Sequence, residues 1–218
     1  MKTIALNASV TRSNDEDAAA LRREMKEAGV LLINLMSSAG AGKTTLLSRL
    51  ITDMKDTRFA VLEADIASTV DAERIEALGA KALQVHTGGM CHMDAGMTAA
   101  AVHEMGCGDV DIAVLENVGN LICPAEYDTG AGLKVMLLSV PEGDDKPLKY
   151  PLMFREADAL VITKLDTLAY FPFDLEACRR RAQALHPNIR IFPVSARTGQ
   201  GMEALEHWLQ DEMKRWRE

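Results

Sequence analysis

The sequence SSAGAGKTT at residues 37–45 places the strongest limit on the fold, because it directly follows the apolar run VLLINLM at residues 30–36. A continuous apolar run of this length is typical of a strand buried on both faces, and helical spacing resumes after the loop. A glycine-rich loop between a strand and a helix turns successive backbone N–H groups inward at the positive end of the helix dipole, where phosphate binds. Gly42, Lys43 and Thr44 supply the end of the phosphate-binding pattern Gly-x₄-Gly-Lys-Ser/Thr.

The match to this pattern is imperfect, because Ser37 stands where the first glycine is expected. We expect Lys43 to reach the β- and γ-phosphates as a catalytic group and Thr44 to bind Mg²⁺. The other expected nucleotide contacts of this loop are Ala39, Gly40, Ala41, Gly42 and Thr45. The alternative is a Gly/Ala-rich turn capped by serine or threonine. The position between a strand pattern and a helix pattern favours nucleotide binding.

Apolar runs alternate with helical patterns along the rest of the chain. Further strands are expected at residues 59–64, 82–87, 111–117, 134–140, 159–164 and 190–195. Helices are expected at residues 15–28, 45–54, 68–79, 174–185 and 202–216. This alternation indicates an α/β fold of the P-loop NTPase type, a doubly wound, mainly parallel sheet flanked by helices on both faces.

The same pass along the chain suggests how it is divided. Residues 1–29 are expected to form a weakly structured arm followed by a helix, and residues 30–218 a single nucleotide-binding domain. The segment EGDDKPLKYP at residues 142–151 contains two prolines and is expected to be a polar loop.

Three later segments carry polar groups in the order that a P-loop GTPase requires. ENVG ends an expected strand, so the Glu116 carboxylate can complete the Mg²⁺ shell while the Gly119 N–H meets the γ-phosphate. TKLD also ends a strand, at the sheet edge where ligands bind in such folds. SAR follows the last expected strand. Each segment alone has a structural interpretation, such as a strand end followed by a helix cap, but together and in order they favour a GTPase.

The second and third segments favour guanine over adenine. Asp166 can accept hydrogen bonds from the N1–H and the exocyclic amine of guanine, a donor pair that adenine lacks. Thr163 and Lys164 belong to the same segment, and the stem of Lys164 can pack along the base. Ser195 and Ala196 resemble a loop that presents a backbone N–H group to guanine O6.

EADIAST at residues 63–69 adds an acid, Asp65, after the second expected strand. In GTPases related to the signal-recognition particle and to metallochaperones, an acid near this point approaches Mg²⁺ or the attacking water. We therefore expect Asp65 to take part in catalysis and in magnesium binding. The alternative is a helix-entry residue, with Ser68 or Thr69 as the cap.

A thiol and an imidazole are adjacent at Cys91 and His92, and Cys123 follows the expected γ-phosphate sensor Gly119 in the stretch NLICPAEYD. Two thiolates and one imidazole suit a borderline-soft divalent ion such as Zn²⁺ or Ni²⁺. Three ligands leave a position open, and a dimer could share ions between its chains. Adjacent ligands are less common than Cys-x-x-Cys spacing, however, and a buried cysteine is usually a small apolar residue. The spacing alone leaves both interpretations open.

Composition limits the partners and the compartment. The net charge of −8 argues against nucleic acid or an anionic membrane as the main partner, because both need a basic face. No stretch approaches the roughly 20 apolar residues of a membrane-spanning helix, and the first residues lack the apolar centre of a signal peptide. The four cysteines are too few and scattered for a disulfide framework, and Cys107 and Cys178 are expected to be structural. We expect a cytoplasmic protein with reduced thiols.

Four stretches together resemble the HypB family, GTPases of the metallochaperone class that help to insert nickel into [NiFe]-hydrogenase. They are NLMSSAGAGKTTLL, TGGMCHMDAGM, ENVGNLICPAEYDTG and, most specifically, LSVPEGDDKPLKYPLMF. The resemblance implies a slow, Mg²⁺-dependent GTPase that forms a GTP-dependent homodimer and carries a nickel or zinc site. The family's metal ligands fall on Cys91, His92 and Cys123. Its partner is the small zinc protein HypA, and the hydrogenase large-subunit precursor would be reached indirectly.

The chain departs from the family pattern in three ways. Many members have Pro where Ala39 stands and Asn where Thr163 stands, but Thr163 keeps a hydroxyl and we expect guanine selectivity to be retained. Some members carry an N-terminal cysteine motif or a histidine-rich tract, and residues 1–30 contain neither. We therefore expect no high-affinity nickel site in this arm, and docking of a partner is the alternative role for it. Two alternatives remain, another metal-handling GTPase such as a urease accessory protein, and a regulatory nucleotide-binding module without metal.

Overall fold

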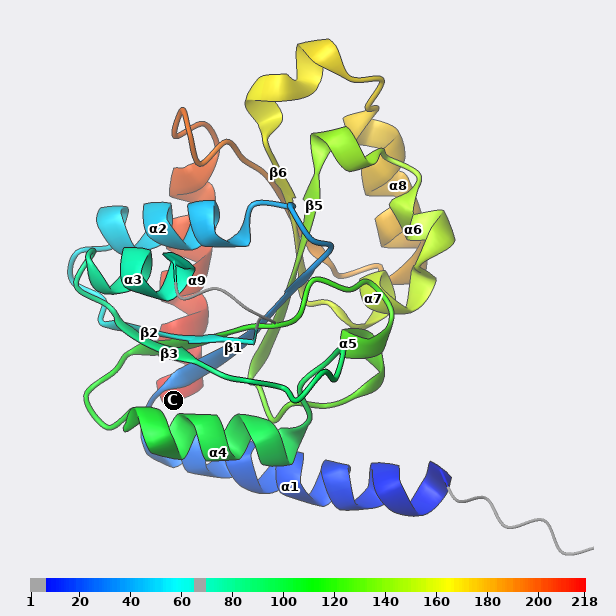
Figure 1. Ribbon diagram of the computed structural model, residues 1–218. Helices are drawn as coiled ribbons and strands as arrows, with labels where there is room; N and C mark the ends of the chain where they lie inside the picture. Colours follow the sequence, from blue (N-terminus) through cyan, green and yellow to red (C-terminus); the bar gives the residue numbers. More distant parts are fainter. Residues whose placement is uncertain (1–6, 65–69) are drawn as a thin grey trace, which may run out of the picture.

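The computed structural model describes residues 7–64 and 70–218. Its centre is a seven-stranded sheet in the order β3-β2-β4-β1-β5-β6-β7 (Figure 1). The strands are β1 (Leu31–Ser37), β2 (Phe59–Glu63), β3 (Lys81–Gln84), β4 (Ile112–Glu116), β5 (Leu133–Ser139), β6 (Ala159–Thr163) and β7 (Arg190–Pro193). Every neighbouring pair in this sheet is parallel. The predicted doubly wound parallel sheet is therefore confirmed, and all seven carboxyl ends of the strands meet at one edge.

Helices cover both faces of the sheet. The longer ones are α1 (Asn7–Glu27), α2 (Lys43–Asp53), α3 (Val70–Glu76), α4 (Ala95–Met105), α8 (Leu175–Leu185) and α9 (Met202–Arg217). Short helical segments are α5 (Cys123–Glu126), η1 (Val140–Glu142), α6 (Lys146–Lys149), α7 (Pro151–Glu156) and η2 (Leu165–Tyr170). No helix in the described part of the chain combines the length and the apolar character needed to cross a membrane.

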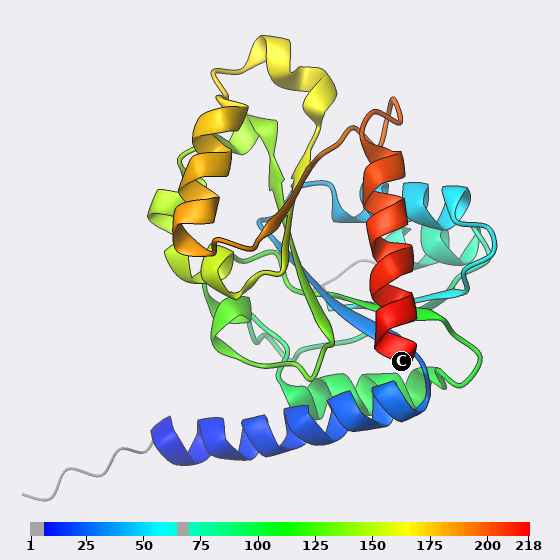
Figure 2. The same cartoon turned by 180° about the vertical axis from the view of Figure 1, so that it is seen from behind.

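Alternate residues of β1 pack against different helix layers, because successive side chains of a strand point to opposite faces. Ile33 and Leu35 belong to the core formed with α2 and α9. Leu32 instead packs with Leu21 and Met25 of α1. Figure 2 shows α9 crossing the sheet, and in both views α1 and α4 run side by side along the other layer. α1 is thus an integral part of the hydrophobic core on the face of the sheet opposite α2 and α9.

Three regions of the chain differ from the sequence-based expectation. α1 begins at Asn7, so the part of the expected loose arm from residue 7 onward is helical. α4 was not expected, because its alanine-rich sequence has apolar residues on most sides and so gives little periodicity. The expected polar loop at residues 142–151 contains α6 and the start of α7, since Pro147 and Pro151 occupy first-turn positions, where a missing N–H costs no hydrogen bond.

Candidate nucleotide and metal site

The loop between β1 and α2 lies at the carboxyl edge of the sheet, where parallel α/β sheets bind ligands. Gly42 precedes α2 with φ of 98°, a left-handed conformation that favours glycine. The Lys43 ammonium donates to the hydroxyl of buried Ser37 at 3.2 Å and lies 4.0 Å from the Glu116 carboxylate. Ser37, which breaks the sequence pattern, therefore helps to orient the lysine expected to hold phosphate.

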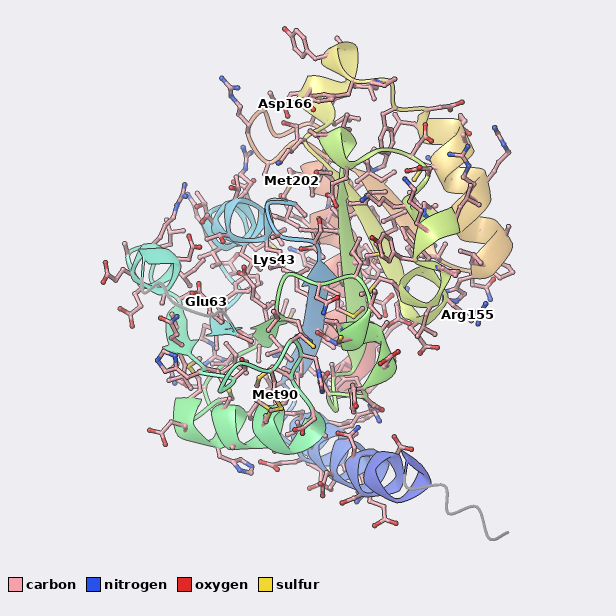
Figure 3. The ribbon with its side chains drawn as sticks, turned by 45° about the vertical axis from the view of Figure 1, so that its right-hand side comes forward. Lys43, Glu63, Met90, Arg155, Asp166 and Met202 are labelled. Atoms are coloured by element: carbon pink, nitrogen blue, oxygen red, sulfur yellow. The ribbon has the colours of Figure 1, made fainter. Side chains whose placement is uncertain are left out.

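Two acidic residues end neighbouring strands here, and one of them lies near this lysine. Glu63 ends β2 and Glu116 ends β4, and the parallel register places these two residues opposite each other. Glu63 is only 2% exposed, and Figure 3 labels both Glu63 and Lys43. Sequence reasoning chose Asp65 in this segment and missed Glu63. Asp65 lies outside the described residues, so its role in catalysis and magnesium binding stays a prediction.

The segments expected to bind guanine surround a cavity of about 220 Å³. The Thr163 hydroxyl donates to the Ala41 carbonyl at 2.6 Å, and the Lys164 ammonium donates to the Gly40 carbonyl at 2.7 Å. The Ser195 hydroxyl donates to the Asp166 carboxylate at 2.6 Å. The lining residues are Gly42, Thr45, Leu46, Thr163, Lys164, Asp166, Thr167, Ala196 and Arg197. Thr163 thus anchors the end of β6 to the phosphate loop.

The three candidate metal ligands come together at the same edge of the sheet. One ligand atom each from Cys91, His92 and Cys123 lies within 4.8 Å of the others. Cys91 is exposed and the other two are half-buried, so solvent and ions can reach the group. The nearby Cys123 thiol is the main cause that raises the pKa of Cys91 above its ordinary value. In Figure 3, Met90, which precedes Cys91, and Asp166 lie on opposite sides of Lys43.

Aromatic stacking fixes the imidazole of the group. The rings of His92 and Tyr127 stack with centroids 4.0 Å apart and an interplanar angle of 10°. Tyr127 directly follows α5, the short helix that Cys123 begins. The stack therefore ties the loop of the Cys-His pair to the loop of the other thiol. A tyrosine four residues after a cysteine gave no sequence signal of this role.

Two asparagines connect the expected γ-phosphate sensor to the metal ligands. The Asn120 amide donates to the Cys91 carbonyl at 3.4 Å, and its oxygen accepts from the Ile122 N–H at 2.8 Å. The Asn117 oxygen accepts from the Met93 N–H at 3.4 Å. Between these asparagines, a Cβ on Gly119 would come within 2.9 Å of the Ala39 backbone nitrogen. The segment of residues 117–120 thus touches the phosphate loop on one side and brackets His92 on the other.

The remaining two thiols are separate from this site. Cys107 and Cys178 are buried in different apolar clusters. Burial raises the pKa of Cys107 and raises that of Cys178 to about 12. Both thiols therefore stay protonated at neutral pH and behave as small apolar residues.

Comparison with known proteins agrees with this geometry. Residues 31–193 match the family described as CobW/HypB/UreG, nucleotide-binding domain. The hydrogenase maturation factor HypB of Rhizobium leguminosarum bv. viciae is 43% identical over 210 residues, which cover 96% of this chain and 70% of that protein. The chain belongs to the HypB family. The hydrogenase/urease maturation factor HypB of Helicobacter hepaticus is 46% identical over 89% of this chain and 81% of its own length.

Solved structures of the HypB family share the whole fold. The crystal structure of HypB from Helicobacter pylori in complex with nickel is 39% identical, with a TM-score of 0.88, and the match covers 93% of this chain and 96% of that one. HypB from Archaeoglobus fulgidus is 33% identical, with a TM-score of 0.87 over 93% of this chain and 99% of its own. The family assigns this chain a P-loop nucleotide-binding domain.

Proposed function

We propose that this protein is a slow, Mg²⁺-dependent GTPase that binds nickel through Cys91, His92 and Cys123 and couples its nucleotide state to nickel delivery during [NiFe]-hydrogenase maturation. The observation that carries this proposal is the convergence of these three ligand atoms at the sheet edge that also bears the phosphate loop and the cavity lined by the expected guanine segments. The names and the nickel complex of the HypB relatives support the same function.

For the nucleotide, each residue has a physical task. Lys43 neutralises the β- and γ-phosphates, and the backbone of the phosphate loop, from Ala39 to Thr45, donates N–H groups to them. Asp166 accepts from the guanine N1–H and amine, and Ser195 holds that carboxylate in place by the bond described above. Ala196 supplies backbone beside the cavity, and Gly119 presents its N–H to the γ-phosphate.

For magnesium, the oxygen donors at this edge fit the preference of that ion for carboxylate and hydroxyl oxygen. Thr44, Glu116 and Asp65 would hold it, and the Glu116 carboxylate already lies 4.0 Å from the Lys43 ammonium. When bound, Mg²⁺ would neutralise charge that develops on the transferred phosphoryl group. Asp65 would orient the attacking water.

Nickel is the cargo in this proposal, and the thiols and the imidazole suit it as well as zinc. The route for coupling is the segment 117–120, whose asparagines bond the backbone on both sides of His92. Contact between Gly119 and a γ-phosphate would shift this segment and with it the position of a ligand, an order–disorder kind of switch. Hydrolysis would restore the other arrangement.

Membership of the HypB family supports a proposal for the partners and the compartment. We propose a cytoplasmic protein that forms a GTP-dependent homodimer and works with a HypA-like protein, with residues 1–29 as an N-terminal element on a domain of residues 30–218. Because one relative is named a hydrogenase/urease maturation factor, urease maturation is the second candidate. Nickel content of the two purified enzymes from cells lacking this protein would separate them.

The experiment that tests the main proposal is metal analysis of the purified protein with GDP and with a non-hydrolysable GTP analogue, recording oligomeric state alongside. We expect about one metal ion per chain, lost in a variant with both Cys91→Ala and Cys123→Ala, and phosphate release from GTP but not ATP. Metal binding that survives the double substitution would contradict the assigned ligands. Nucleotide binding without metal binding would favour the alternative of a regulatory nucleotide-binding module.

A further inference from the structure

Helix α1 contacts both of the segments that carry the candidate metal ligands. Asn14 of α1 donates its amide to the Asp128 carbonyl at 2.9 Å, five residues after Cys123. The oxygen of the same side chain accepts from the Ala95 N–H at 2.9 Å, three residues after His92. One amide group therefore spans the two ligand-bearing segments, which lie more than 80 and 110 residues away from it in sequence.

The bond to Ala95 also satisfies a backbone N–H group at the start of α4. The first N–H groups of a helix have no partner within the helix. Asp94 caps α4 by accepting from the Met97 N–H at 2.8 Å, and Asn14 satisfies the N–H of the first residue, Ala95. Met93, just before the cap, is fully buried. The chain between His92 and α4 is thus fixed at its helix end by a residue of α1.

A second residue of α1, Arg22, also binds the segment that follows Cys123. Arg22 of α1 donates to both carboxylate oxygens of Asp128, at 2.6 and 2.7 Å, and to the Ala131 carbonyl at 3.0 Å. Burial opposes ionisation of Asp128, but Arg22 and the Gly130 N–H together lower its pKa below the ordinary value. A Cβ on Gly130 would come within 2.9 Å of the Leu21 side chain, so only glycine allows this close approach to α1.

The position of Asn14 on α1 sets it apart from solvent-exposed polar residues. Asn14, Ala18, Leu21 and Met25 follow the spacing of one helix face, and the last three are buried in the core shared with the sheet. Asn14 therefore occupies a core-facing position with a polar side chain. Its two bonds go to backbone atoms of the two metal loops, which a purely apolar contact could not hold in register.

We propose that α1 is a clamp for the metal site, with Asn14 as the positioning residue that sets the spacing between the Cys91–His92 loop and the Cys123 loop. The inference rests on the proposed function, since it requires nickel to bind these ligands. Because binding couplings are reciprocal, nickel must stabilise the docking of α1 as much as docked α1 favours nickel.

The test compares nickel titrations of the wild type, Asn14→Ala and Asp17→Ala, an exposed residue of the same helix. Partners outside the ligand set typically change metal affinity by 10- to 100-fold, and we expect Asn14→Ala to weaken nickel binding about tenfold. Thiolate-to-nickel charge-transfer absorption at saturation should also fall, while GDP affinity stays at the wild-type value. Asp17→Ala should match the wild type in all three measurements.

Hydrogen exchange provides a second measurement that does not depend on the folding of Asn14→Ala. Nickel should slow exchange of the α1 amides, and this protection should vanish in Cys123→Ala. Unchanged nickel affinity and absorption in Asn14→Ala, or no protection of α1 by nickel, would overturn the clamp even if Asn14→Ala lowers the melting temperature. Wild-type protein that binds no nickel through its cysteines would instead contradict the proposed function itself.

Discussion

The nucleotide edge and the metal loops sit side by side but are positioned by different means. The expected nucleotide ligands lie within five residues of the carboxyl end of a strand or in the first turn of α2, as Thr163 and Lys43 illustrate. The candidate metal ligands lie on irregular connections or at the start of a single-turn helix, and side-chain amides such as Asn120 hold them in place. The sheet thus positions the nucleotide site in advance. The geometry of the metal ligands instead depends on a few side-chain hydrogen bonds, which movement of the adjacent segments can change.

Lys43→Ala should break the nucleotide side alone, with the largest effect. Removing a positioned charge from a phosphoryl-transfer site costs about a thousandfold in rate, so phosphate release from GTP should fall by about that factor. Nickel affinity should not change, because the Lys43 contacts are with Ser37 and Glu116 and not with either metal loop. Lys55→Ala, at an exposed lysine beyond α2, is the control. A parallel loss of nickel binding would show that the two regions are not separable.

Cys123→Ala should break the metal side alone. Loss of one of three protein ligands should weaken nickel binding by at least about a hundredfold, while GTP hydrolysis without nickel continues at the wild-type rate. Cys178→Ala provides a matched control, since that buried thiol lies in another cluster and its pKa is raised to about 12. Calorimetric titration with nickel compares the three proteins. Equal affinities would remove Cys123 from the ligand set.

Asp111→Asn should lower only the stability of the fold and leave nucleotide and nickel binding intact. We expect this effect to be the smallest of the three. The Arg58 guanidinium is the main cause that lowers the pKa of Asp111 below its ordinary 3.8, and Arg217 adds a bond at 2.6 Å. Because Arg58 is largely exposed, we expect a loss of about 1 kcal/mol in the free energy of unfolding at pH 7.

The sign of the pH dependence follows from that lowered pKa. Above pH 4 the carboxylate is charged in both folded and unfolded chains, and its full contribution is present. Below pH 4 the unfolded chain takes up the proton first, so wild-type stability falls and the difference from Asp111→Asn shrinks. Urea unfolding at pH 7, 5, 4 and 3 measures this. A difference that grows on acidification would contradict the assigned ion pair.

The same contrast explains what could be predicted from the sequence. A strand end followed by a glycine-rich loop is a local pattern, so the phosphate loop and the guanine segments were placed correctly at the sheet edge. Glu63 was not singled out because its position opposite Glu116 depends on the register of β2 against β4. The proximity of Cys91 and Cys123 was only one of two open interpretations until the family resemblance favoured it, since no local pattern relates two loops about thirty residues apart.

Asn14 was also missed, although a weak signal was present. It is a polar residue on the helix face that Ala18, Leu21 and Met25 make apolar. Periodicity identifies such a position, but which backbone groups it bonds depends on tertiary packing between α1, α4 and the loop after α5. Residues that bond to two separate loops are therefore the hardest part of this site to predict from the sequence.

The most direct test of the central claim is a pair of nickel titrations of the wild-type protein, one with GDP and one with a non-hydrolysable GTP analogue. The coupling through residues 117–120 predicts nickel affinities that differ by at least about fivefold, with nickel shifting the preference between the two nucleotides by the same factor. Asn120→Ala should bring that ratio towards one. Equal nickel affinity in the two nucleotide states of the wild type would contradict the account.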